Sequence, residues 1–179
     1  MLVKKSVVPI NLRRKDYKKW GSQNAFFADA YIFDNTEECI VYAKELMLNI
    51  CSSDYQVYLL IQPPYPEERI LEHCYTYFGV PLRKTKKNNG AIWIVTGEEF
   101  RGIVDEILLL WGMNDRMQIY FAKESNRLGD CNYTISGKFQ FRLEDFMCVI
   151  NECDYIITDS GDGEEFELIR CRTEIGATS

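Results

Sequence analysis

The sequence predicts a single α+β domain in which a mixed, largely antiparallel sheet has helices packed on it. Two observations support this prediction: strand-like runs follow one another across short turns typical of hairpins, and capped amphipathic segments lie between them. The 179 residues contain no linker rich in Pro, Gly or Ser, so one domain over residues 1–179 accounts for the chain. Hydrophobic residues make up 46% and charged residues 27%, the composition of a folded globular protein.

Charge changes sign along the chain. The basic N-terminal segment, residues 1–20, has a net charge of +6, and the pattern assigns it no secondary structure. Residues 144–179 hold ten acids against two arginines, and the whole chain has a net charge of −6. Although cations and aromatic side chains near the start would suit nucleic acid, the net negative charge disfavours a polyanionic partner. We expect no nucleic-acid partner.

The first elements are expected to be a strand, a helix and a second strand. Residues 25–33 are aromatic and apolar and end at a turn, which is typical of a strand. Asn35 then caps a helix, and Glu38 three residues later completes a capping box. The helix shows one apolar face, made of Ile40, Ala43, Met47 and Ile50. Residues 55–61 form a buried strand that stops before two prolines.

A second helix and a hairpin are predicted next. Pro66 suits the first turn of a helix over residues 66–78, and Gly79 suits its end. Two short strands, residues 82–85 and 91–95, flank a turn whose Asn89-Gly90 pair tolerates the positive φ of a tight hairpin.

The clearest amphipathic helix begins at Thr96. Thr96 and Glu99 form a capping box, and Gly112 ends the helix. Its apolar face consists of Phe100, Ile103, Val104, Ile107, Leu108 and Trp111.

The last third of the sequence is predicted to contain further strands and one short helix. Residues 117–122 form a strand, residues 133–143 a hairpin, and residues 144–151 the helix. A final hairpin reads DYIITD, SGDGE and FELIRC, with Gly161 and Gly163 in its tight reversal.

Motifs for catalysis, cofactors and metals are missing from the sequence. His73 is the only histidine, and its neighbour Cys74 points about 100° away on a helix, so the pair does not form a relay. No glycine-rich phosphate loop occurs, and the cysteines and His73 lack the spacing of a zinc site. Paired acids on the helix after Thr96 fit its solvated face. The sequence therefore predicts a protein without catalytic residues, cofactor or metal.

The seven cysteines and the N-terminus indicate a reducing compartment. Seven is an odd number, no C-x-x-C pair occurs, and the apolar stretch near the start is interrupted too early for a secretory signal. No apolar run reaches the roughly 20 residues of a membrane-spanning helix. We expect reduced thiols, a cytoplasmic location and no membrane partner.

The acidic C-terminal hairpin is the candidate binding surface. A cluster of carboxylates would attract a cationic protein, raising the association rate and the specificity, and an exposed tyrosine would serve as an anchor. The predicted partner-binding residues are Asp154, Tyr155, Asp159, Asp162, Glu164, Glu165 and Glu167. The alternative is that these charges form an ordinary solvated face.

Residues 142–169, a short helix followed by this acidic hairpin, resemble segments of bacterial immunity proteins. These families neutralise a cognate toxin, including the toxins of contact-dependent growth inhibition. The resemblance implies an inhibitor that is not an enzyme and that covers a basic toxin domain, often a nuclease, by protein–protein contact. It transfers no functional residue, because the segment contains no diagnostic motif.

Two other classes of function remain open alternatives. One is an enzyme with an unorthodox acidic active site, which would place perturbed ionisable groups in a deep pocket. The other is a regulatory or structural module that assembles with itself, whereas the inhibitor is expected to be a monomer.

Overall fold

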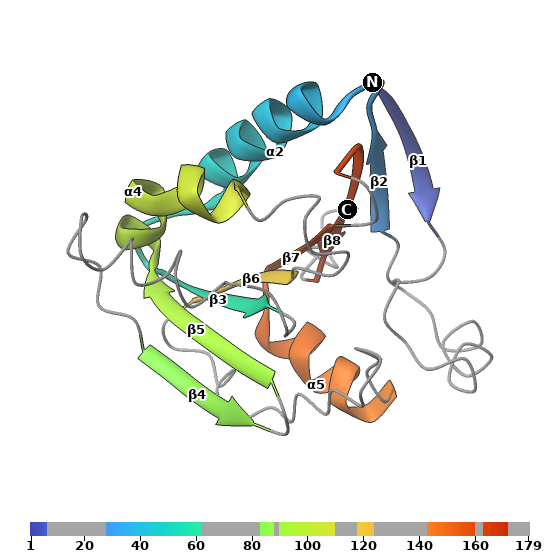
Figure 1. The fold of residues 1–179 in the computed structure, drawn as a ribbon. Coiled ribbons are helices and arrows are strands. Elements are labelled where there is room, and N and C mark those ends of the chain that lie inside the picture. The colour runs from blue at the N-terminus through green and yellow to red at the C-terminus, as the bar shows by residue number, and fades with distance from the viewer. Residues whose placement is uncertain are drawn as a thin grey trace, which may run out of the picture.

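An antiparallel sheet forms the centre of the protein (Figure 1). The computed structural model describes residues 1–6, 28–61, 83–87, 90–109, 118–123, 143–159 and 163–171. These residues contain eight strands: β1 (Leu2–Ser6), β2 (Ala28–Ile32), β3 (Tyr55–Ile61), β4 (Arg83–Lys87), β5 (Gly90–Thr96), β6 (Gln118–Lys123), β7 (Tyr155–Asp159) and β8 (Glu165–Arg170).

The strands are ordered β1-β2-β8-β7-β6-β3-β5-β4. Every neighbouring pair is antiparallel, so the described strands include no parallel pair of the kind a mixed sheet would have. The predicted α+β class, a single domain with a largely antiparallel sheet and helices packed on it, is confirmed.

Helices lie on both faces of the sheet. Figure 1 shows α2 (Thr36–Ile50) and α4 (Gly97–Leu108) above the strands and α5 (Leu143–Glu152) on the opposite side. In β2, β3 and β5 to β8, the residues that face α2 and α4 include buried apolar side chains, which form the core with the buried stripes of the two helices. Among its buried members are Val57, Leu59, Ile119, Phe121, Ile157, Phe166, Leu168, Ala43, Met47, Phe100, Ile103 and Ile107. Of the helices described, none combines the length and the apolar character needed to cross a membrane.

Both predicted N-cap residues are present, but of the two predicted capping boxes only the one at α4 has both of its hydrogen bonds among the described residues. The Asn35 side chain accepts from the Glu38 backbone N–H at 2.9 Å and starts α2. At α4 the capping box is complete: the Glu99 N–H donates to Thr96 Oγ1 at 3.1 Å, and the Thr96 N–H donates to Glu99 Oε2 at 2.7 Å. The prediction placed the end of this helix at Gly112, but α4 ends at Leu108.

The hairpins also follow the predicted pattern. The last hairpin is β7 and β8, and Gly163 before β8 has a φ of 80°, which only glycine adopts readily. In the hairpin of β4 and β5, Gly90 pairs with Lys87, so Gly90 belongs to the strand and not to the turn where it was predicted. The predicted helix over residues 66–78, and residues 133–142 of another predicted hairpin, lie outside the described residues.

The basic N-terminal segment contains a strand that the sequence pattern did not predict. β1 pairs with β2 at one edge of the sheet, and β4 forms the other edge. The two edge strands are lysine-rich, reading LVKKS and RKTKK. Charged edges oppose the addition of further strands, so this charge is consistent with protection against aggregation.

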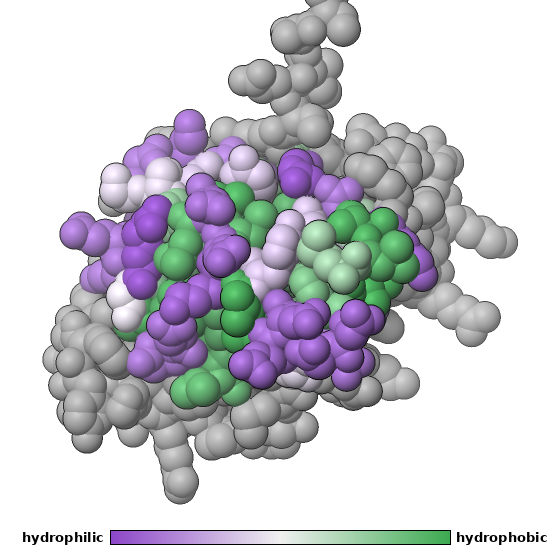
Figure 2. Space-filling view, turned by 90° about the horizontal axis from the view of Figure 1, so that it is seen from above, coloured by the Kyte–Doolittle hydropathy of each residue, from purple (hydrophilic) through white to green (hydrophobic). Residues whose placement is uncertain are grey.

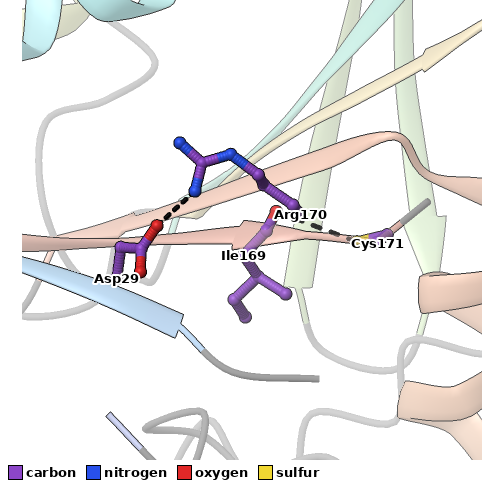
Figure 3. A network of polar contacts seen from close by, with 4 residues as sticks. All are labelled: Asp29, Ile169, Arg170 and Cys171. Atoms are coloured by element: carbon purple, nitrogen blue, oxygen red, sulfur yellow. Dashed lines mark hydrogen bonds and ion pairs between the residues drawn. The ribbon is translucent and has the colours of Figure 1, made fainter. Parts of the chain in front are cut away.

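An ion pair joins β2 to β8, which lie far apart in the sequence. The Arg170 guanidinium donates to the Asp29 carboxylate, and Figure 3 shows the Arg170 side chain pointing from β8 toward β2. Burial opposes the charged form of Arg170, but hydrogen bonds to Asp29 and Tyr31 outweigh it and hold the Arg170 pKa above its ordinary value. Next to it, the Cys171 thiol donates to the Ile169 carbonyl at 4.0 Å.

We expect Asp29→Asn to lower the free energy of unfolding by about 1 kcal/mol, since it removes the charge from a hydrogen-bonded pair whose arginine is partly exposed. The matched control is Asp105→Asn, which breaks the more exposed pair of Lys44 with Asp105. There we expect less than about 0.5 kcal/mol. Urea unfolding of both variants measures the difference, and equal losses would show that burial of Asp29 does not matter.

Candidate binding surface

The acidic hairpin lies within the sheet, and of its four predicted acids whose side chains the structure describes, two are buried and one is half-buried. Counted from β1, β8 is the third strand of the sheet and β7 the fourth. Asp154 and Glu167 are buried, with 9% and 5% of their surface exposed. Tyr155 is half-buried against the core. These three positions therefore offer little surface to a partner.

The other predicted partner-binding residues lie at the turn of the hairpin. Glu164 is exposed and Glu165 half-buried, whereas Asp162 and the Asp159 side chain lie outside what the structure describes. Among the predicted residues whose side chains the structure describes, Glu164 is the one classed as exposed.

Glu167 belongs to a buried polar row on the sheet face away from α2. It lies opposite Thr158 on β7, which in turn lies opposite Gln118 on β6. Thr158 and Gln118 are each only 3% exposed, and the Tyr120 hydroxyl donates to Gln118 Oε1. Because the row runs across three central strands, it belongs to the interior of the protein.

The Cys51 thiol and the Tyr55 hydroxyl, two potential nucleophiles, both remain protonated near neutral pH. Burial raises the pKa of the Cys51 thiol to about 11, and the thiol lies 3.6 Å from the Gly97 carbonyl oxygen as a donor. Burial also raises the pKa of Tyr55, as does its hydrogen bond to the Asp154 carboxylate. Neither group is therefore a thiolate or phenolate near neutral pH.

The cysteines depart from prediction at one position. Cys39, Cys51, Cys153 and Cys171 are free and buried, as expected of reduced thiols. Cys148 is disulfide-bonded, so the expectation of reduced thiols is wrong there. Cys148 is exposed on α5, where a second thiol has access to it. Its partner lies outside the described residues.

A pocket of about 540 Å³ lies at the start of α2, beside the N-terminal end of β1. Its apolar lining comes from three separate segments: Met1 at the N-terminus, Phe33 after β2, and Val41 and Tyr42 of α2. Its polar lining consists of Asn35, Glu37, Glu38 and Glu45. The volume is in the range of roughly 300–1,000 Å³ that is usual for ligand sites.

Aromatic rings form the wall between the pocket and the core. The rings of Phe33 and Tyr42 lie 5.5 Å apart, centroid to centroid, and both also contact Phe166. Phe166 stacks on Tyr31 at 4.8 Å with an interplanar angle of 11°. This aromatic cluster, Tyr31, Phe33, Tyr42 and Phe166, fixes β2, β8 and α2 to one another and supports the pocket.

Exposed acids line the α2 side of the pocket. Glu37, Glu38 and Glu45 are exposed on α2. Glu164 is also exposed, and its backbone carbonyl accepts a hydrogen bond of 2.9 Å from the N–H of Phe33, which lines the pocket. Lys44, the one basic residue of α2, is held by Asp105 of α4 at 2.6 Å. Within the described residues, no lysine or arginine forms an ion pair with the three α2 glutamates. The pocket rim is therefore negatively charged.

Exposed apolar side chains lie at the same end of the molecule. Met1, Leu2 and Val3 are 61%, 52% and 46% exposed, and Val41 is 53% exposed. Figure 2 looks onto this side and shows apolar side chains open to solvent between hydrophilic ones. Apolar surface within a charged rim is typical of a protein-binding site.

No family model, curated protein or solved structure matches this chain. The candidate surface therefore depends on the geometry alone. No three His, Cys, Asp or Glu side chains in the described part of the chain lie close enough to hold a metal ion, and His73 is outside that part.

Sequence reasoning missed most of this surface. It treated Glu38 only as a capping residue and assigned no element to Met1. The available signal was the i, i+4, i+8 stripe of Glu37, Val41 and Glu45, which places an apolar residue between two acids on one face of α2.

Proposed function

We propose that this protein acts by binding a basic protein, in the manner of an immunity protein that neutralises a toxin. The observation that carries the proposal is the apolar pocket at the start of α2, lined by three glutamates that form no ion pair with a lysine or arginine of the described segments. Carboxylates around an apolar centre attract a cationic surface from a distance, and the centre then provides contact area that excludes water. Such inhibition requires no catalytic step.

The enzyme alternative has less support at this pocket. A catalytic acid is normally set apart from water by apolar neighbours. The pocket glutamates are exposed to solvent instead, and the buried Cys51 and the half-buried Tyr55 both have a raised pKa and hold their protons near neutral pH.

The test begins with affinity capture on the full chain, followed by growth assays. Expression of the captured protein alone should arrest growth, and co-expression with this chain should restore it. A captured protein that is harmless, or that stays toxic in the presence of this chain, would contradict the immunity proposal.

The binding surface is tested with a charge-reversal variant of the same chain. We expect Glu37→Lys, Glu38→Lys and Glu45→Lys together to slow association with the captured protein about 10- to 100-fold at low salt, since they remove long-range attraction. The control reverses Glu98, Glu106 and Glu144, an equal charge change on α4 and α5 that also includes a first-turn position. On-rates measured against ionic strength distinguish the two, and an equal loss in the control would place the surface elsewhere.

A further inference from the structure

We infer that the pocket receives an arginine side chain projecting from the partner. This inference depends on the proposed function, because it names the group of the basic partner that the pocket recognises. It rests on three features of the pocket: an accessible aromatic ring, glutamates on both sides of that ring, and apolar side walls.

The accessible ring is Tyr42. Phe33 is only 7% exposed, whereas Tyr42 is half-buried and lines the pocket with part of its surface. The contacts of Tyr42 with Phe33 and Phe166 hold the ring in place. The face of an aromatic ring attracts a cation within about 6 Å of its centroid.

The glutamates flank this ring along the helix. Glu38 precedes Tyr42 by four residues and Glu45 follows it by three, and both spacings bring side chains together on one helix face. A cation placed on Tyr42 therefore has a carboxylate toward each end of the helix. Lys44, the basic residue of α2, is bound to Asp105 and so does not occupy this position.

Arginine fits these features better than lysine. Its planar guanidinium stacks on a ring and donates two parallel hydrogen bonds to a carboxylate, which an ammonium group cannot do. The apolar walls at Met1 and Val41 suit the methylene stem that carries the guanidinium. The pocket volume of about 540 Å³ leaves room for part of the neighbouring residue as well.

The experiment titrates the full chain with N-acetyl-arginine amide and follows the methyl resonances of Val41 and Met1 by NMR. We expect saturable shifts, and affinity at least about five-fold higher than for N-acetyl-citrulline amide, which has nearly the same shape without the charge. N-acetyl-lysine amide should also bind more weakly than the arginine probe. Equal shifts with citrulline, or no shifts at these methyl groups, would overturn the inference.

Variants locate the probe. Tyr42→Leu removes the ring, but it also alters packing in the core. Variants at the exposed positions Glu45 and Val41 therefore test the binding site without disturbing that packing. Glu45→Gln should weaken binding of the arginine probe, and Val41→Arg should abolish it by filling the pocket with the chain's own guanidinium. Glu98→Gln on α4 is the matched control and should leave binding unchanged. Full probe binding in both Glu45→Gln and Val41→Arg would refute the assignment.

The two proposals fail separately. If the arginine probe does not bind although the α2 charge reversal slows association with a toxin, the surface is right and the arginine assignment is wrong. If the probe binds but no toxin is neutralised, the pocket recognises arginine and the immunity function is wrong.

Discussion

Phe166→Ala is expected to lower the free energy of unfolding by about 3–5 kcal/mol, the range for losing a fully buried phenylalanine. Phe166 has 0% of its surface exposed, and its ring contacts Tyr31, Phe33 and Tyr42. Alanine would leave a cavity between β2, β8 and α2, because rings fixed by three elements cannot collapse fully into the space. The loss is measured by urea unfolding.

The control for this prediction is Val41→Ala, at an exposed position that lines the pocket next to the aromatic cluster. Val41 is 53% exposed, so its truncation should change stability by less than about 0.5 kcal/mol. A loss below about 1 kcal/mol for Phe166→Ala would mean that the aromatic cluster does not hold the two strands to α2. In that case the rigid wall of the pocket would also be in doubt.

Gly97→Ala and Gly102→Ala are expected to have opposite effects, although both lie in α4. A Cβ on Gly97 would come within 2.1 Å of the Ser52 carbonyl oxygen and 3.3 Å of Cys51 Sγ. The oxygen belongs to the backbone and cannot rotate away, so α4 or the segment after α2 must move. We expect a loss of about 2–3 kcal/mol, typical of an overpacked site.

At Gly102 nothing lies within 4 Å of an added Cβ, and the position is exposed within the helix. Alanine there should stabilise the protein by about 0.5–1 kcal/mol, because it restricts the unfolded chain and favours the helix. Thermal and urea unfolding of the two variants test the pair. A stabilising Gly97→Ala would show that α4 does not approach Ser52 as closely as described.

The features predicted correctly are those that depend on neighbours in the sequence. The Thr96 and Glu99 capping box links residues three apart, and the buried stripe of α4 repeats every three to four residues. Likewise the β7–β8 hairpin pairs strands joined by a short turn. Each of these follows from local backbone geometry, which the sequence displays directly.

The exposure of the acids on β8 could not be predicted from neighbouring residues. Alternating acids in EFELIR suggest a strand face open to solvent, yet Glu167 is buried and lies between Ala30 of β2 and Thr158 of β7. Nothing in the pattern of β8 reveals that residues 28–32 are its second neighbour. Pairing over such a separation depends on how the whole chain closes, which local periodicity does not encode.

The sequence by itself determined the α+β class, the helix caps, the amphipathic face of α4 and the terminal hairpin, because each depends on residues a few positions apart. Tertiary structure alone decided the strand order, the burial of Asp154 and Glu167, and the pocket that brings Met1 beside Phe33 and α2. The physical reason is that the exposure of a side chain depends on which distant segments pack against it. That packing is set by the close-packed core as a whole and not by residues nearby in the sequence.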